Sequence, residues 1–280
     1  MVRIITDSAA DFEPAELEQQ NIICIPLTVL FGQTDYHENV DLSKDRFYDL
    51  LKASEGFPKT SQASPQVLAD LFEDAKRCGD EAVYITLSSA LSGTYQSAMF
   101  IREGADYAGA YVVDSKNATG GQRMLVEHAV RLRDAGKTAA EIVAGVEEMR
   151  DRIVLYASIN TLEYLYRGGR ISHTAYTLGT LAQIKPIIHV DHHGRVDIPA
   201  KAMGMRKGME HLCKQVDAKP VDEDFPLYVM YTDDRSVAET LAIHLAEHGH
   251  TVHPNHIIQV GAAIGSHIGP AACGLVYVGA

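Results

Sequence analysis

A cluster of small hydroxyl residues follows an apolar run at residues 82–87. The segment 87–98 reads LSSALSGTYQSA and places Ser92, Gly93 and Thr94 at the expected start of a helix. Free amide groups at a helix start carry partial positive charge, and glycine lets an anion approach the backbone closely. The hydroxyls of Ser92 and Thr94 add donors. The pattern suits a carboxylate or a phosphate, and a simple helix cap is the alternative.

Two further candidate side chains stand next to glycines. His267 lies in GSHIGP, residues 265–270, where we expect a fixed, tight loop. Arg170 lies in YRGGRIS, where two glycines permit positive φ. A guanidinium or an imidazole at such places could contact an anion. The alternatives are a structural histidine and an arginine paired with a surface acid.

In the first half, short apolar runs alternate with amphipathic stretches, which predicts a mostly parallel sheet flanked by helices. We expect strands at residues 2–6, 82–87 and 110–113, and helices at 13–20, 43–54, 65–78, 94–104, 120–135 and 138–150. Ligands bind beyond the carboxyl ends of such strands. We therefore expect Thr6–Ser8, Ser88–Thr94 and Asp114–Ser115 to share one edge of the sheet. A further polar loop is expected at residues 59–62, before a helix that Ser64 would cap.

The second half predicts another α/β domain. Its expected strands are 154–160, 227–232, 256–261 and 274–278, with a hairpin from 185–190 and 195–198 and helices at 161–166, 175–181, 203–216 and 236–248. The expected boundary near residue 155 gives domains 1–155 and 156–280, with a ligand between them.

Composition narrows the class of protein. The 280 residues are 46% hydrophobic and carry a formal net charge of −12, and an acidic surface repels nucleic acid and anionic lipid heads. No stretch resembles a signal peptide or a membrane span, so a soluble cytoplasmic protein is expected. The four cysteines form no CxxC pair, which indicates reduced, buried thiols.

Seven motifs occur in an order that resembles the DegV family over essentially the whole chain. They are TDSAAD, KTSQASP (59–65), LSSALSGTYQSA (87–98), VVDS (112–115), NTLEYLYRGGRIS (160–172), IKPI (184–187) and IGSHIGPAACG (264–274). The resemblance implies a carrier, not an enzyme, that holds one long-chain fatty acid between two α/β domains and needs no other cofactor. It also implies that a partner, an ATP-dependent fatty acid kinase, converts the presented carboxyl group to an acyl phosphate.

The resemblance further implies roles for individual residues. Thr60 and Ser92 would hold the carboxylate, and Ser61, Gly93 and Thr94 would complete the cradle. His267 would be a third contact, and Arg170 would lie beside the carboxyl group at the mouth. An acyl chain would need an apolar tunnel, and we expect second-domain residues such as Leu162, Leu165, Leu178, Leu181 and Ile184 to line it, with ordinary core packing as the alternative.

The chain departs from the family pattern at several places. Ala63 replaces the proline of QPS, Ala90 and Ala271 replace glycines, and Asn160 replaces the aspartate of DTLEYL. These changes leave the hydroxyls and His267 in place. They bear on the identity and length of the ligand more than on the binding of a carboxylate.

Two other functions are compatible with the residue types. Ser92 or Ser89, His267, and Asp7 or Asp114 could form a hydrolase triad, although no G-x-S-x-G elbow is present. A metal-binding module could use the histidines between residues 244 and 256, of which two have i, i+4 spacing. They are His244, His248, His250, His253 and His256.

Overall fold

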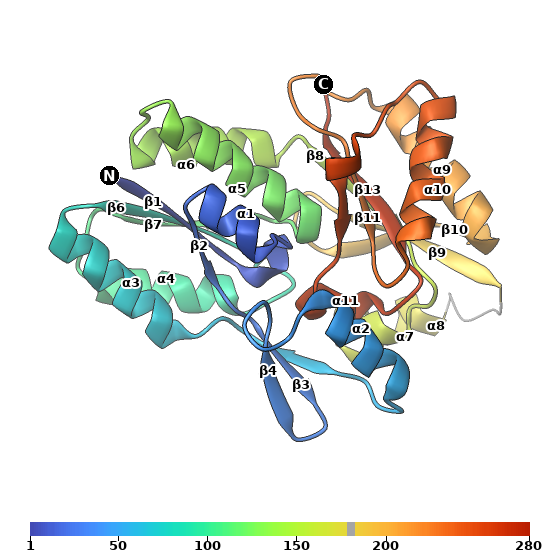
Figure 1. Ribbon diagram of the computed structural model, residues 1–280, viewed down its shortest axis with the longest axis horizontal. Coiled ribbons are helices and arrows are strands. Elements are labelled where there is room, and N and C mark those ends of the chain that lie inside the picture. Colours follow the sequence, from blue (N-terminus) through green and yellow to red (C-terminus); the bar gives the residue numbers. More distant parts are fainter. Residues whose placement is uncertain (178–182) are drawn as a thin grey trace.

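The computed structural model describes residues 1–177 and 183–280. Its first sheet is entirely parallel, with strand order β2-β1-β6-β7. These strands are β1 (Val2–Asp7), β2 (Ile22–Ile25), β6 (Glu81–Thr86) and β7 (Ala110–Asp114). Helices cover both faces of this sheet (Figure 1). One face carries α3 (Pro65–Cys78) and α4 (Thr94–Gly104), and the other carries α5 (Thr119–Asp134) and α6 (Ala139–Arg150). The short helices η1 (Ser8–Ala10) and α1 (Pro14–Gln19) follow β1. The predicted parallel α/β arrangement is confirmed.

The second sheet is mixed, with strand order β10-β9-β8-β13-β11-β12. The strands are β8 (Ile153–Ser158), β9 (Ile184–Val190), β10 (Val196–Met203), β11 (Tyr228–Tyr231), β12 (Ile257–Gln259) and β13 (Cys273–Val278). The predicted hairpin is confirmed, because β9 and β10 pair antiparallel. The helices of this half are α7 (Glu163–Arg167), α8 (His173–Thr177), α9 (Gly204–Ala218) and α10 (Arg235–Glu247), with η2 (Pro254–His256) before β12. The helix expected over 175–181 lies partly outside the described residues.

A third, small sheet has the order β4-β3-β5 and was not foreseen. It consists of β3 (Thr28–Phe31), β4 (Thr34–His37) and β5 (Lys59–Ser61), with α2 (Lys44–Ala53) between β4 and β5. The prediction that residues 59–62 form a loop was wrong, because residues 59–61 pair with β3. Ser64 also differs from expectation: Pro65 begins α3, but the Ser64 side chain makes no capping hydrogen bond.

The loop predicted around His267 is a helix, α11 (Ala262–Ile268). Gly265 lies inside this helix. The position needs a glycine because Phe47 and Tyr48 pack so closely that a Cβ there would collide with both rings. Gly269, with φ of 72°, ends the helix. In Figure 1, α11 lies beside α2, and it also contacts β3 and β5. A segment of the second half therefore packs into the small sheet of the first.

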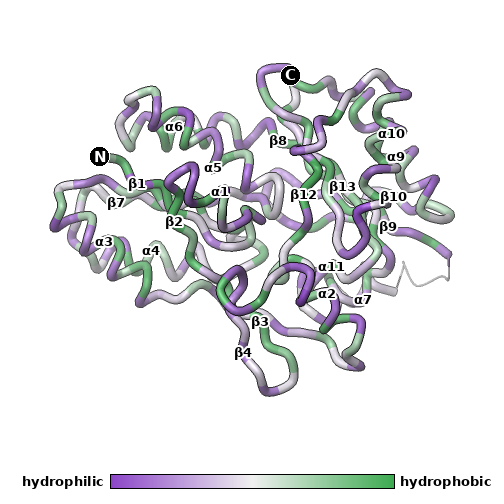
Figure 2. Tube along the Cα trace, in the orientation of Figure 1, coloured by the Kyte–Doolittle hydropathy of each residue, from purple (hydrophilic) through white to green (hydrophobic). Residues whose placement is uncertain are grey.

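One apolar cluster spans the two halves. Helix α5 packs against the parallel sheet and also against β13, and Gly120 lies so close to Val276 that a Cβ would collide with it. Ser88 also bridges the halves, since its Oγ donates to the Gly194 carbonyl at 2.8 Å. Figure 2 shows the apolar residues concentrated along the strands of the two larger sheets. Strand β8 begins at Ile153, and the domain boundary near residue 155 remains a prediction.

Two features bear on the environment of the protein. The described part of the chain contains no helix with the length and apolar character needed to cross a membrane. The four cysteines are free thiols, but only Cys213 and Cys273 are buried, while Cys78 is exposed, contrary to the expectation of four buried thiols.

Candidate ligand-binding site

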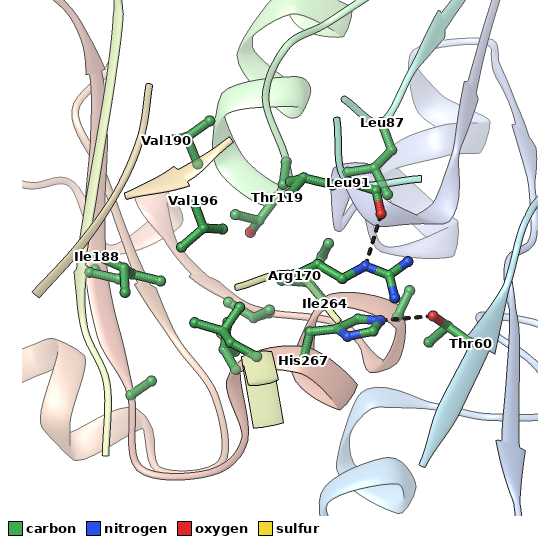
Figure 3. Close-up of a pocket in the computed structure, with 18 of the residues that line it drawn as sticks. Thr60, Leu87, Leu91, Thr119, Arg170, Ile188, Val190, Val196, Ile264 and His267 are labelled. Atoms are coloured by element: carbon green, nitrogen blue, oxygen red, sulfur yellow. Dashed lines mark hydrogen bonds between the residues drawn. The ribbon is translucent and has the colours of Figure 1, made fainter. Parts of the chain in front are cut away.

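A cavity of about 290 Å³ lies between the carboxyl edge of the parallel sheet and the second sheet. Its volume is close to the lower limit of small-molecule sites, roughly 300 Å³. Figure 3 shows Thr60, Arg170 and His267 at one end and Ile188, Val190 and Val196 at the other. Both halves contribute apolar wall, including Leu27, Leu87, Leu91, Leu155, Leu165 and Met230. The cavity is therefore amphipathic, with one polar end.

Two aspartates accept hydrogen bonds from the loop that follows β6, at the carboxyl edge of the parallel sheet. Asp7 Oδ2 accepts a hydrogen bond from the Leu87 amide at 2.8 Å. Asp114 Oδ1 accepts from the Ser89 amide at 3.0 Å. Burial raises the pKa of Asp7 to about 6. The predicted meeting of the three polar strand ends is confirmed, and both aspartates are occupied in holding these loops.

Thr60 and His267, 207 residues apart in the chain, form a direct pair. Thr60 lies on β5 and its Oγ1 is 2.8 Å from His267 Nε2 on α11. Burial, reinforced by the charge of Arg170, lowers the pKa of His267 to about 4. The imidazole is therefore neutral at pH 7. If Nε2 carries the proton, it donates to Thr60 Oγ1 and leaves the threonine hydroxyl proton free for an anion in the cavity.

The imidazole of His267 packs directly against Gly168. A Cβ at Gly168 would collide with Nδ1 of the ring, although the φ of −74° at Gly168 is open to any residue. Glycine is needed here for close approach and not for conformation. Nδ1 itself is buried and has no hydrogen-bond partner among the described residues.

Arg170 supplies the positive charge of the polar end. Its Nε donates to the Leu91 carbonyl at 2.9 Å, and its Nη1 donates to the Gly168 carbonyl. Burial lowers the pKa of the guanidinium. Within residues 1–177 and 183–280, no carboxylate lies at ion-pair distance from Arg170, so the alternative of a surface ion pair was wrong. A half-buried cation held only by carbonyl groups leaves room for an anionic partner.

The serine–glycine segment reaches the same end of the cavity. Ser92, Gly93 and Ser61 line the cavity together with Thr60, Arg170 and His267. Thr94 does not line it. Thr94 is buried, its amide donates to Ser92 Oγ at 3.2 Å, and its hydroxyl lies 2.9 Å from the same atom. The structure thus brings six of the seven predicted residues to the cavity wall, and Thr94 supports Ser92 from behind.

Some lining residues were missed by sequence reasoning. Gln62 lines the polar end, and its Oε1 lies close enough to Gly93 that a Cβ there would approach it to 2.9 Å. Its place next to Thr60 and Ser61 in KTSQ was the available signal. Ile264 and Ile268 of α11 also line the cavity, and they were not predicted because this segment was expected to be a loop.

The predicted tunnel residues divide into wall and core. Leu165 lines the cavity, whereas Leu162 is buried in a cluster with Ile159 and Ile188, and Ile184 does not line it. Leu178 and Leu181 lie outside the described residues. The predicted lining residues all belong to the second half, but Leu27, Leu87 and Leu91 of the first half also line the cavity.

The geometry opposes the two alternative functions. A hydrolase triad needs a carboxylate behind the histidine, but Nδ1 of His267 has no partner in the described chain. His248 and His250 lie against Asp217, and His244 lies against Glu247. Across the described ranges, no three His, Cys, Asp or Glu side chains are grouped to hold a metal ion.

Comparison with known proteins gives a consistent result. All 280 residues match the family described as "Uncharacterised protein, DegV family". A DegV domain-containing protein of Clostridium perfringens is 34% identical, and the alignment covers 99% of this chain and 97% of the relative.

Solved structures are similar over the full length. A DegV family protein from Thermus thermophilus, whose description reports fatty acid binding, has 28% identity and a TM-score of 0.90, covering 100% of this chain and 99% of the other. DegV of Bacillus subtilis, described as a fatty acid binding protein, has 28% identity and a TM-score of 0.86 with the same coverage. A stearic acid-binding protein from Eubacterium ventriosum has 25% identity and a TM-score of 0.89, covering 100% and 98%. With its whole length, its fold and its motifs in agreement, this chain belongs to the DegV family.

Proposed function

We propose that this protein binds a long-chain fatty acid, with the carboxylate at the polar end of the cavity and the acyl chain along its apolar wall. Thr60, Ser92 and His267 would contact the carboxylate, Arg170 would balance its charge, and Ser61 and Gly93 would complete the cradle. The observation that carries the proposal is the half-buried Arg170, which has no carboxylate partner in the described chain and lies with Thr60 and His267 at one end of a mostly apolar cavity. The fatty acid binding reported for the similar Thermus thermophilus and Bacillus subtilis proteins supports it.

The energetics favour an amphipathic acid over a small anion. Moving a carboxylate out of water is unfavourable by several kcal/mol unless donors replace the water. Two hydroxyls, an imidazole and a guanidinium can do so. Each buried CH₂ group contributes about 0.8 kcal/mol. A long acyl chain therefore supplies the free energy that an isolated carboxylate lacks.

Mass spectrometry of protein that has never been delipidated tests the proposal. We expect organic extraction to release close to one fatty acid per chain. Thr60→Val and Ser92→Ala should each reduce the amount retained. Extracts that contain no stoichiometric lipid would count against fatty acid binding.

We further propose that the protein is a cytoplasmic carrier, without membrane insertion or catalytic activity of its own, that presents the carboxyl group to an ATP-dependent fatty acid kinase. The position of Arg170 supports this role, because its guanidinium is only half buried and would lie beside the group to be phosphorylated. Reconstitution with such a kinase, ATP and bound fatty acid tests it. We expect Arg170→Ala to reduce acyl phosphate formation more than fatty acid retention. Equal loss of both would refute that division of roles.

A further inference from the structure

Two buried carboxylates of the first half hold the beginning of α11. Asp11 Oδ1 accepts a hydrogen bond from the Gly261 amide at 2.9 Å, and Glu38 Oε1 accepts from the Ala263 amide at 3.1 Å. Gly261 is the N-cap residue of α11. Amide groups at a helix start have no partner within the helix. Both acceptors are therefore supplied by residues that are more than 220 positions away in the chain.

The chain holds these two carboxylates in place from behind. Ser8 Oγ donates to Glu38 Oε2 at 2.6 Å, and the Thr119 hydroxyl donates to Asp11 Oδ2. Asp11 and Glu38 are each 1% exposed. The buried Lys44 ammonium donates to the Asp11 carbonyl at 2.8 Å and to Glu13 at 2.7 Å. Among the described residues, neither side-chain carboxylate forms an ion pair, and each accepts one hydrogen bond from a hydroxyl and one from an amide at the start of α11.

Gly261 shows how close the contact is. Its φ of −77° and ψ of −179° are ordinary extended values that any residue adopts. A Cβ at this position would nevertheless collide with the carboxylates of both Glu38 and Asp11. Glycine is therefore required by the approach of the two acids and not by the backbone.

The other end of α11 carries part of the proposed ligand site. His267, which meets Thr60, is five residues beyond Ala262, so the two ends are about 8 Å apart at 1.5 Å per residue. Ala263, Ile264 and Ile268 line the cavity. In so short and rigid an element, a displacement at the start moves His267 by a similar amount.

We propose that Asp11 and Glu38 are positioning residues of the fatty acid site, which hold α11 so that His267 meets Thr60 and the α11 side chains form the cavity wall. The identity of the ligand in this inference rests on the proposed fatty acid binding, whereas the placement of His267 by Asp11 and Glu38 does not. Tyr48 assists, because its hydroxyl donates to the Val260 carbonyl at 2.9 Å.

The protonation of the two acids provides a signature of this role. Burial raises the pKa of Asp11 to about 6 and of Glu38 to about 7. Because these folded-state values lie above the usual carboxyl pKa, stability from these groups is present at low pH and lost as the pH rises through 6 to 7. Ionised oxygens are the stronger acceptors for the α11 amides. Protonation of the two acids as the pH falls therefore weakens their hydrogen bonds to α11, and it also lowers the free-energy cost of burying them.

Several other groups that face the two acids also titrate or carry charge. They are Asp7, Cys24, Lys44, Tyr48 and Arg123. A pH effect is therefore assigned to Glu38 or Asp11 only by comparison with a neutral variant of similar shape.

The test uses Glu38→Gln and Asp11→Asn in the full chain, with Glu127→Gln as a matched control. Glu127 is a partly buried carboxylate that also has a raised pKa, but it contacts Arg123 and Tyr228 and not α11. In the ligand-free protein, labelled histidine is observed by NMR, with the His267 signal assigned through His267→Asn. We expect the pKa of His267 to rise from about 4 by at least one unit in Glu38→Gln and Asp11→Asn, since a displaced imidazole gains solvent. Glu127→Gln should leave it unchanged.

The second measurement is the release rate of palmitate between pH 8 and pH 5.5. We expect wild-type release to accelerate severalfold as the pH falls, and Glu38→Gln to release palmitate fast throughout, without lower thermal stability at pH 8.

If His267 titrates as in the wild type in both variants, the inference is overturned. If wild-type protein binds no palmitate, the proposed function fails, and the NMR result still decides the inference. If a variant does not fold, Gly261→Ala is measured in the same way and should also raise the pKa of His267; an unchanged value overturns the inference.

Discussion

The two halves of the chain bring different chemistry to one cavity. The first half provides neutral hydroxyls, Thr60 and Ser92, on segments fixed by strand pairing and by the carboxylates of Asp7 and Asp114. The second half provides the guanidinium of Arg170, which follows the short helix α7, and the imidazole of His267, which lies on the short helix α11. A carboxylate needs both the donors and the charge. Neither half contributes all the polar residues at this end of the cavity, so the packing of the two halves against each other determines how these residues meet.

The largest effect should come from breaking the apolar wall of the second half. Ile188 is 5% exposed and lines the cavity. In Ile188→Asp, a carboxylate without a partner would lie beside the acyl chain, at a cost of several kcal/mol, so we expect palmitate affinity to fall by more than about 100-fold. Calorimetric titration measures it, with circular dichroism to verify folding. Ile188→Val is the control, and similar affinities for both variants would contradict an acyl chain at this wall.

A smaller loss is expected from the hydroxyls of the first half. A hydrogen bond to a charged group contributes about 1.5–3 kcal/mol, so Thr60→Val and Ser92→Ala should each weaken palmitate binding by about 10-fold or more. A methyl ester of palmitate, which lacks the charge, should lose less when either variant is compared with the wild type. Equal losses for acid and ester would place the carboxylate elsewhere.

The imidazole of the second half should respond to the ligand. The pKa of His267 is about 4 in the ligand-free protein, and a carboxylate beside it favours the protonated form. We expect palmitate to raise this pKa by at least one unit. Because the lowered pKa makes the charged ring unfavourable in the folded state, the stability that His267 provides is present above pH 6.5 and is lost as the pH falls toward 4. NMR titration with and without palmitate measures the shift, and an unchanged pKa would argue against contact.

The smallest change in binding should follow from Leu162→Ala. Leu162 is 2% exposed and belongs to the core beside the cavity, not to its wall. We expect the free energy of unfolding to fall by about 2–5 kcal/mol. Palmitate affinity should change by less than about threefold, because the substitution removes no ligand contact. Chemical denaturation and calorimetric titration together distinguish core from wall, and a loss of affinity as large as that of Thr60→Val would assign Leu162 to the wall.

Much of the first half could be predicted because its signals are local. Alternating strands and helices specify the parallel sheet, and the rule for carboxyl ends of strands then brings Ser92 and Gly93 to the right edge. The seven motifs of the family located Thr60, Arg170 and His267 on the cavity.

Elements that depend on distant partners were not predicted. The three residues of β5 are a strand only because β3 pairs with them, and the seven residues of α11 are held by Asp11, Glu38 and Tyr48. Such short segments carry too few residues for a periodic pattern. Leu162 and Leu165 could not be separated for a related reason: they have the same type and neighbouring positions, and only the packing of α7 decides which one faces the cavity.

The bare Cα of Gly168 has a consequence for reading related chains. Any side chain at this position would occupy the volume of the His267 ring edge, so a homologue without this glycine cannot keep its histidine in the pose that meets Thr60. A single methyl group there would displace His267 from Thr60 while every residue that lines the cavity stayed the same. A glycine at position 168 is thus a marker of relatives in which a histidine can take the same pose against the threonine.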